Sequence, residues 1–104
     1  MRHAGQNVIE NVQVSLTSKV PGNARDYAVA KIAPLARYAP GSVDLAAVRL
    51  TTTAGRRARP LVVAHARLTV NGAGLNAEVT ASTYTEAIDQ LHDRMRDLLL
   101  KSHD

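Results

Sequence analysis

Histidines and a repeat of aspartates are the residues of this sequence best suited to acid–base or metal chemistry. The four histidines are scattered, and none shares an expected element with a second His, Asp or Glu at a metal-ligand spacing. Asp89, Asp93 and Asp97 recur every four residues, but no apolar pocket is expected beside them to perturb their pKa values. A charged, solvent-facing stripe is therefore favoured over a cation or acid–base site. We expect no metal site.

Nucleophilic and cofactor chemistry find no better support. The sequence contains no Cys, which excludes disulfides, thiolate zinc sites and a cysteine nucleophile. Ser and Thr are plentiful, but none has a neighbouring base or lies in a nucleophile-elbow motif. A phosphate loop and a dinucleotide-binding fingerprint are also missing. We therefore expect no catalytic residue, no cofactor and no small-molecule substrate: the protein is predicted not to be an enzyme.

The arginines are the remaining chemical feature. Lys and Arg number 13 against 9 Asp and Glu, a net charge of +4, and ten of the basic residues are Arg. Segment 45–82 contains a single acidic residue, Glu78, and five arginines: Arg49, Arg56, Arg57, Arg59 and Arg67. The guanidinium group matches phosphate well, so this segment favours binding to a polyanion such as nucleic acid. An ordinary solvated basic surface stays equally open from composition alone.

Other features of the composition narrow the class of protein. The aromatic residues are three Tyr, with no Phe or Trp, so a module that stacks single-stranded bases on aromatic side chains is disfavoured. No apolar run approaches the roughly 18 residues of a membrane span, and no apolar signal core follows the first residues. The length fits one domain. We expect a soluble, cytoplasmic protein that does not contact membranes.

The first half of the chain predicts a strand followed by an interrupted helix. Alternation from Val8 places Val12, Val14 and Leu16 on one side of a strand. Helical spacing begins at Ala24, and its apolar stripe comprises Ala24, Ala28, Ile32, Leu35 and Ala36. Pro34 lies within this stripe. Because proline has no N–H, it should kink the helix or divide it into two pieces.

The second half predicts three strands. Residues 43–52 form the first, with Arg49 on its outer face, and residues 62–70 show the clearest alternation in the sequence. Asn71-Gly72 is a strong hairpin-turn signal. The last strand follows it, with inward residues Leu75, Ala77, Val79 and Ala81.

A long helix is expected to end the domain. Thr83 and Glu86 have the spacing of a capping box. The predicted buried stripe comprises Ile88, Leu91, Met95, Leu98 and Leu99. Asp93 with Arg96, and Asp97 with Lys101, have spacings that allow ion pairs on the exposed side.

These elements give the order β-α-β-β-β-α and an α+β fold. We expect a two-layer sandwich in which two helices pack on one face of a four-stranded sheet, while the other face is polar. The strand–helix–strand unit implies one parallel pairing with a right-handed crossover. Residues 1–6 are interpreted as a flexible tail and residues 7–104 as the folded domain.

Three segments resemble a known family, the ribosome hibernation-promoting factors, also called ribosome-associated inhibitor, protein Y or sigma-54 modulation protein. The segments are residues 25–32 with 35–38 in the first helix, the hairpin 68–72, and residues 87–89, 91, 93–95 and 101 in the last helix. The resemblance covers about residues 8–104, and its specificity lies in the order and spacing of the segments. The family has the same β-α-β-β-β-α topology.

The resemblance implies a function in translation. Family members bind the decoding region of the small ribosomal subunit through ribosomal RNA, where they block mRNA and tRNA and preserve idle ribosomes in stress, stationary phase or dormancy. Residues 7–104 would then be the ribosome-binding domain. Carried over by position, the RNA-binding residues are Lys31 and Arg37 in the first helix and Arg94 and Lys101 in the last.

Departures from the family pattern suggest that some contacts have moved. Both helices are less basic than is usual, because Ala30, Pro34, Asp97 and His103 stand where relatives often have basic residues. We hypothesise that part of the phosphate contact lies instead on Arg49, Arg56, Arg57, Arg59 and Arg67. The alternative left open is that the loop arginines, Arg56, Arg57 and Arg59, are disordered and bind nothing specifically.

Two further points stay open from the sequence. Many relatives carry a C-terminal domain that pairs ribosomes, and this chain ends where their first domain ends, so it is either a short member or part of a longer protein. The alternative function is a protein-interaction module that acts by sheet-edge pairing or self-association. A general binder of double-stranded RNA is a variant of the first interpretation.

Overall fold

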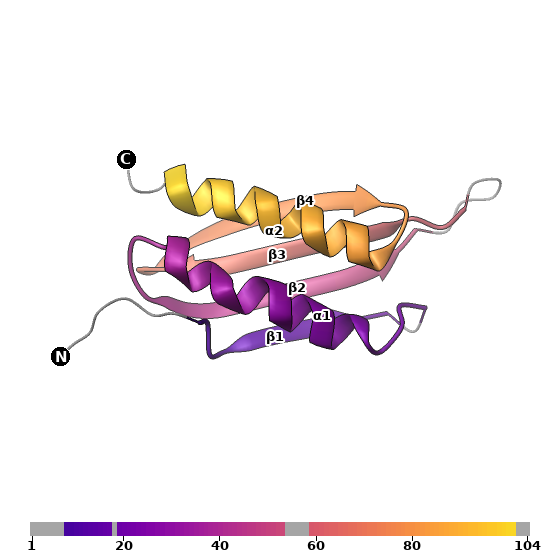
Figure 1. Cartoon of the computed structure of the whole chain (residues 1–104), viewed down its shortest axis with the longest axis horizontal. Coiled ribbons are helices and arrows are strands. Elements are labelled where there is room, and N and C mark those ends of the chain that lie inside the picture. The colour runs from indigo at the N-terminus through magenta and orange to yellow at the C-terminus, as the bar shows by residue number, and fades with distance from the viewer. Residues whose placement is uncertain (1–7, 18, 54–58, 102–104) are drawn as a thin grey trace.

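The computed structural model describes residues 8–17, 19–53 and 59–101, and shows a sheet covered on one face by helices (Figure 1). The predicted tail therefore lies outside the described residues. The elements are β1 (Val12–Leu16), α1 (Ala24–Ile32), a 3-10 helix η1 (Ala33–Tyr38), β2 (Val43–Thr52), β3 (Val62–Val70), β4 (Ala73–Ala81) and α2 (Tyr84–Lys101). This order and the α+β class confirm the predicted fold.

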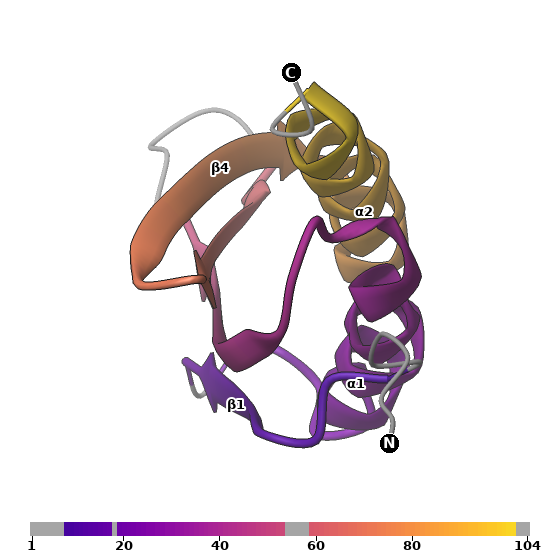
Figure 2. The ribbon, with the colours of Figure 1, turned by 90° about the vertical axis from the view of Figure 1, so that its left-hand side faces the viewer.

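The sheet has the strand order β1-β2-β3-β4. β1 runs parallel to β2, as the crossover through α1 requires, and the other pairings are antiparallel. Both helices lie on the same face of the sheet, α1 over β1 and α2 over β3 and β4 (Figure 2). The opposite face is open, so side chains from alternate residues of all four strands point to solvent there.

Pro34 divides the first helical segment, as predicted. α1 ends at Ile32, and the chain continues from Ala33 to Tyr38 as the 3-10 helix η1, with Pro34 in its first turn. Proline is tolerated there because its N–H would have no partner at a helix start. The apolar stripe stays continuous across the break, since Ile32 and Leu35 are both fully buried.

The core contains only apolar side chains among the described residues. Its largest fully buried members are Ile32, Leu35, Val48, Leu50, Leu68, Ile88, Leu91, Met95 and Leu99. Every residue expected in the stripe of the last helix is buried except Leu98, which is half-buried at the margin of the core. Leu98 instead borders a groove between α2 and β4.

The cap of α2 differs in one bond from the predicted capping box. Thr83 Oγ1 accepts from the backbone N–H of Glu86 at 3.1 Å, as expected. The Glu86 carboxylate, however, accepts from the N–H of Ser82 at 3.1 Å, one residue before the N-cap. The side chain thus ties Ser82, the first residue after β4, to the first turn of α2.

The β3–β4 turn requires a glycine at position 72. Asn71 and Gly72 both have positive φ, 51° and 81°, as a two-residue type I′ hairpin turn requires. Gly72→Ala should lower the free energy of unfolding by about 1 kcal/mol, because a Cβ is strained in the left-handed region. Gly22→Ala is the control, since φ there is not positive and its Cβ would meet nothing within 4 Å. Urea unfolding of both variants tests this; equal losses would contradict it.

Candidate nucleic-acid interface

The described basic residues of the predicted site lie in three places: on the helices, on the open face of the sheet and in the segment before β3. Lys31 and Arg37 lie on α1 and η1, and Arg94 and Lys101 on α2. Arg49 and Arg67, here called the sheet-face pair, project from β2 and β3 on the open face, on the other side of the sheet from the helices. Arg59 is exposed just before β3, whereas Arg56 and Arg57 lie outside the described residues.

The two cations of the first helical segment, Lys31 and Arg37, already contact other groups of the protein. Lys31 Nζ lies 3.6 Å from Asp89 Oδ1 on α2 and 5.7 Å from the centre of the Tyr27 ring. Arg37 Nε donates to the carbonyl of Pro34 at 3.4 Å, and its guanidinium carbon lies 5.8 Å from the Tyr38 ring centre. A phosphate at Lys31 would therefore compete with the Asp89 carboxylate.

A contact between the helices involves Tyr27 and Asp89, 62 residues apart in the chain. The Tyr27 hydroxyl donates to Asp89 Oδ1 at 2.6 Å, and the rings of Tyr27 and Tyr84 pack edge to face, 6.4 Å between centres. This hydrogen bond is the main cause that raises the pKa of Tyr27; partial burial and the Asp89 charge act in the same direction. Asp89 is thus a helix–helix contact as well as part of the acidic stripe.

The Tyr27–Asp89 hydrogen bond should give stability a characteristic pH dependence. Because the folded-state pKa of Tyr27 is raised, the contribution is fully present below the unfolded value of about 10 and is lost as pH rises through the folded-state pKa. Unfolding free energies of the wild type and Tyr27→Phe, measured from neutral to alkaline pH, should differ at neutral pH and converge above the folded-state pKa. A difference that is constant with pH would contradict the assignment.

Asp93 and Asp97 of α2 contact basic side chains of their own helix. Asp93 Oδ1 lies 2.9 Å from His92 Nδ1 and 3.8 Å from Arg96, the pair predicted. The hydrogen bond with His92 is the main cause that lowers the pKa of Asp93, with the Arg96 charge acting alongside it. Asp97, expected to pair with Lys101, lies instead 3.4 Å from Arg96. The reason is that the Arg96 guanidinium reaches both carboxylates.

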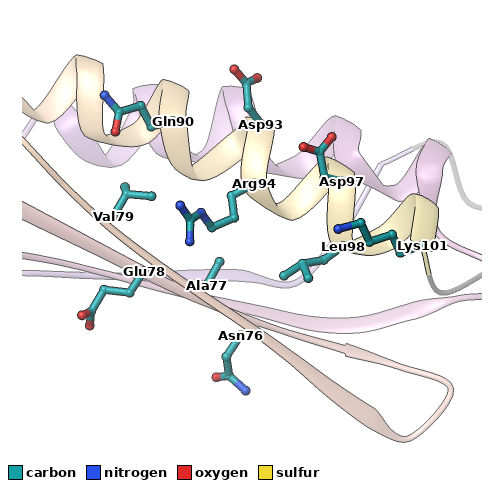
Figure 3. A pocket seen from close by; sticks show the side chains of 10 residues that line it. All are labelled: Asn76, Ala77, Glu78, Val79, Gln90, Asp93, Arg94, Asp97, Leu98 and Lys101. Carbon is teal, nitrogen blue, oxygen red and sulfur yellow. The ribbon is translucent and has the colours of Figure 1, made fainter.

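This pairing leaves two cations of α2 free. In the described part of the chain, neither Arg94 nor Lys101 has an ion pair, and both are exposed. Both line a groove of about 780 Å³ between α2 and β4. In Figure 3 the Arg94 side chain extends from α2 toward Ala77 and Val79, whereas the carboxylates of the neighbouring aspartates point away from the strand. Glu78, Asp93 and Asp97 line the same groove, so the positive charge that it offers a ligand is local to the Arg94 and Lys101 side chains.

The sheet-face pair lies in a polar row across the open face. The register places Ser15, Arg49, His65 and Glu78 side by side on β1 to β4. Arg67 is two residues along β3 from His65, and its guanidinium lies over Gly74, where a Cβ would come within 2.7 Å of it. Arg49 and Arg67 form no ion pair with another described residue. His65 is thus placed among both arginines and Glu78.

Within residues 8–17, 19–53 and 59–101, no three His, Asp or Glu side chains come together as a metal site would need. Nor does any helix in these ranges have the length and apolar character to cross a membrane. The candidate interface thus comprises Arg49 and Arg67 on the open face and Arg94 and Lys101 in the groove, with Arg59 exposed just before β3.

We compared the sequence and the fold with those of known proteins. No family model matches the sequence, and no curated protein matches it. Solved structures share the fold, among them the following two. A ribosomal subunit interface protein from Coxiella burnetii is 14% identical, with a TM-score of 0.70 over 89% of this chain and 97% of its own. The Protein Y N-terminal domain of Thermus thermophilus is 25% identical, with a TM-score of 0.71 over 88% and 97%. The structural resemblance predicted from the sequence is confirmed.

Proposed function

We propose that this chain is a ribosome-associated, non-enzymatic factor of the cytoplasm. It binds the decoding region of the small ribosomal subunit through ribosomal RNA and so blocks mRNA and tRNA. The observation that carries the proposal is the fold shared with a ribosomal subunit interface protein and with Protein Y over most of the chain. The sequence segments that resemble hibernation factors support the same function, which would preserve idle ribosomes during stress or stationary phase.

The mechanism is occupancy of a polyanionic cleft. Arg49 and Arg67 face out from one side of the sheet, while Arg94 and Lys101 face the groove beside α2, so the two-layer domain carries free cations on two surfaces. Guanidinium and ammonium groups bind phosphates through charge and hydrogen bonds, and no reaction is catalysed. The bound domain then excludes mRNA and tRNA sterically. The buried apolar core keeps the two surfaces at a fixed separation.

Salt dependence tests the proposal. Co-sedimentation with purified small subunits should weaken steeply with salt, because each neutralised phosphate releases counterions. For four phosphate contacts, affinity should fall on the order of 100-fold between about 50 and 200 mM salt. Absence of binding to vacant subunits at low salt would overturn the proposal. Competition with plain duplex RNA separates ribosome binding from general binding of double-stranded RNA.

The second candidate function is a protein-interaction module. The outer edge of β4 favours it, because that edge pairs with no further strand among the described residues. The two functions predict different behaviour in a nuclease-treated cell extract. A ribosome ligand would leave the heavy fraction when the RNA is digested, whereas a module held by a protein partner would keep its complex.

A further inference from the structure

The two edges of the sheet are not equivalent. β1 has five residues, and the carbonyl of Val14 accepts a 2.6 Å hydrogen bond from Arg25 of α1. β4 has nine residues and pairs only with β3 in the described part of the chain. Successive residues of an antiparallel strand alternate between facing the partner strand and facing outward, so the outer edge of β4 presents unpaired N–H and C=O groups. It is the edge open to a further strand.

The cations beside this edge, Arg94 and Lys101, indicate the charge that an added strand would carry. On the helix side, Arg94 extends over β4 and Lys101 follows it seven residues later along α2 (Figure 3). Seven helical residues span about 10.5 Å, which is about three residues of an extended strand. The nearby Asp93 and Asp97 are engaged by Arg96. Residues on one face of a strand are about 6.8 Å (two residues) or about 13.6 Å (four residues) apart, so the spacing of Arg94 and Lys101 falls between the two. The long Arg94 and Lys101 side chains can adjust to carboxylates at either pair of positions.

We propose that β4 and the groove between β4 and α2 bind an extended acidic peptide segment by strand addition. Backbone hydrogen bonds to β4 supply the pairing, and carboxylates on the helix side contact Arg94 and Lys101. Side chains on the other side lie next to Glu78 and Thr80 on the open face, which disfavours acidic residues there. The recognised pattern is thus acidic at every second residue and uncharged between.

Charge complementarity favours this occupant over two others. A second copy paired through β4 about a twofold axis would place the cations of one groove next to those of its mate, which is repulsive. An RNA strand could contact Arg94 and Lys101 but would leave the N–H and C=O row of β4 without the ladder that it is built to complete. An acidic peptide satisfies both the backbone edge and the cations.

The test uses the whole protein and no ribosomes, so its result is independent of the proposed function. The probe is a fluorescently labelled peptide of alternating Thr and Glu, matched to the nine residues of β4. Fluorescence anisotropy should show saturable binding, and hydrogen exchange should slow at amides of β4. A peptide of alternating Thr and Lys should bind at least about 10-fold more weakly, and so should a Thr–Glu peptide N-methylated on alternate residues, which cannot complete the ladder.

The matched variants separate the groove from general charge. Arg94→Gln with Lys101→Gln should weaken binding of the Thr–Glu peptide about 10-fold or more. Lys19→Gln with Asn23→Asp lowers the net charge equally at exposed positions away from β4 and should bind like the wild type. Circular dichroism checks that both variants are folded.

Four results would overturn the proposal. Equal binding of the N-methylated peptide would mean electrostatic adhesion without strand addition. Equal loss in both double variants would mean that overall charge, not the groove, controls binding. Protection of β4 by a nine-nucleotide oligouridylate but not by the peptide would make the groove a nucleic-acid surface. If the protein dimerised with increasing concentration and the β4 amides were protected without peptide, the edge would bind a second copy of the chain.

Discussion

Arg94→Glu combined with Lys101→Glu is expected to lower the affinity for the small ribosomal subunit about 100-fold. Both cations are exposed and unpaired within the described residues, so a phosphate need not displace an internal carboxylate to reach them. Reversal removes two charge-assisted contacts and sets two carboxylates against the RNA backbone. The dissociation constant from co-sedimentation at low salt, together with a shallower salt dependence, measures the effect.

The control for this variant keeps the same net charge. Lys19→Glu with Asn11→Asp and Asn23→Asp changes exposed side chains that lie neither on α2 nor in the groove, and lowers the net charge equally. Because distant surface charges are screened within about 10 Å at 0.1 M salt, this control should lose only a few-fold in affinity. If both variants bind alike, Arg94 and Lys101 are not specific contacts, and attraction is a property of total charge.

The fold follows from periodicity because each element buries one face. Alternation in residues 62–70 predicts β3, since Val62 to Val70 put every second side chain into the core. The break at Pro34 and the turn at Asn71-Gly72 follow from the backbone chemistry of proline and glycine. These signals are local, so they can be read without knowing which elements meet.

The charged surface could be predicted only in part, because ion pairing depends on contacts between elements and on side-chain reach. No local signal links Tyr27 to Asp89, since their contact exists only after α1 and α2 pack together. The spacing of Asp97 and Lys101 allows an ion pair, yet Asp97 pairs instead with the adjacent Arg96. Which cations stay free, and hence which can bind a phosphate, is therefore a property of the folded surface.

The sheet-face pair gives the second large effect. Arg49→Glu with Arg67→Glu should lower the affinity for the small subunit by roughly 100-fold if the open face contacts ribosomal RNA as proposed, because neither guanidinium is paired with a described carboxylate. The pair lies on the opposite side of the sheet from α2, so its effect should add in free energy to that of Arg94→Glu with Lys101→Glu. Affinities of the two double variants and the quadruple variant measure that additivity. A sheet-face variant that binds like the wild type would instead place the RNA on the helical side alone.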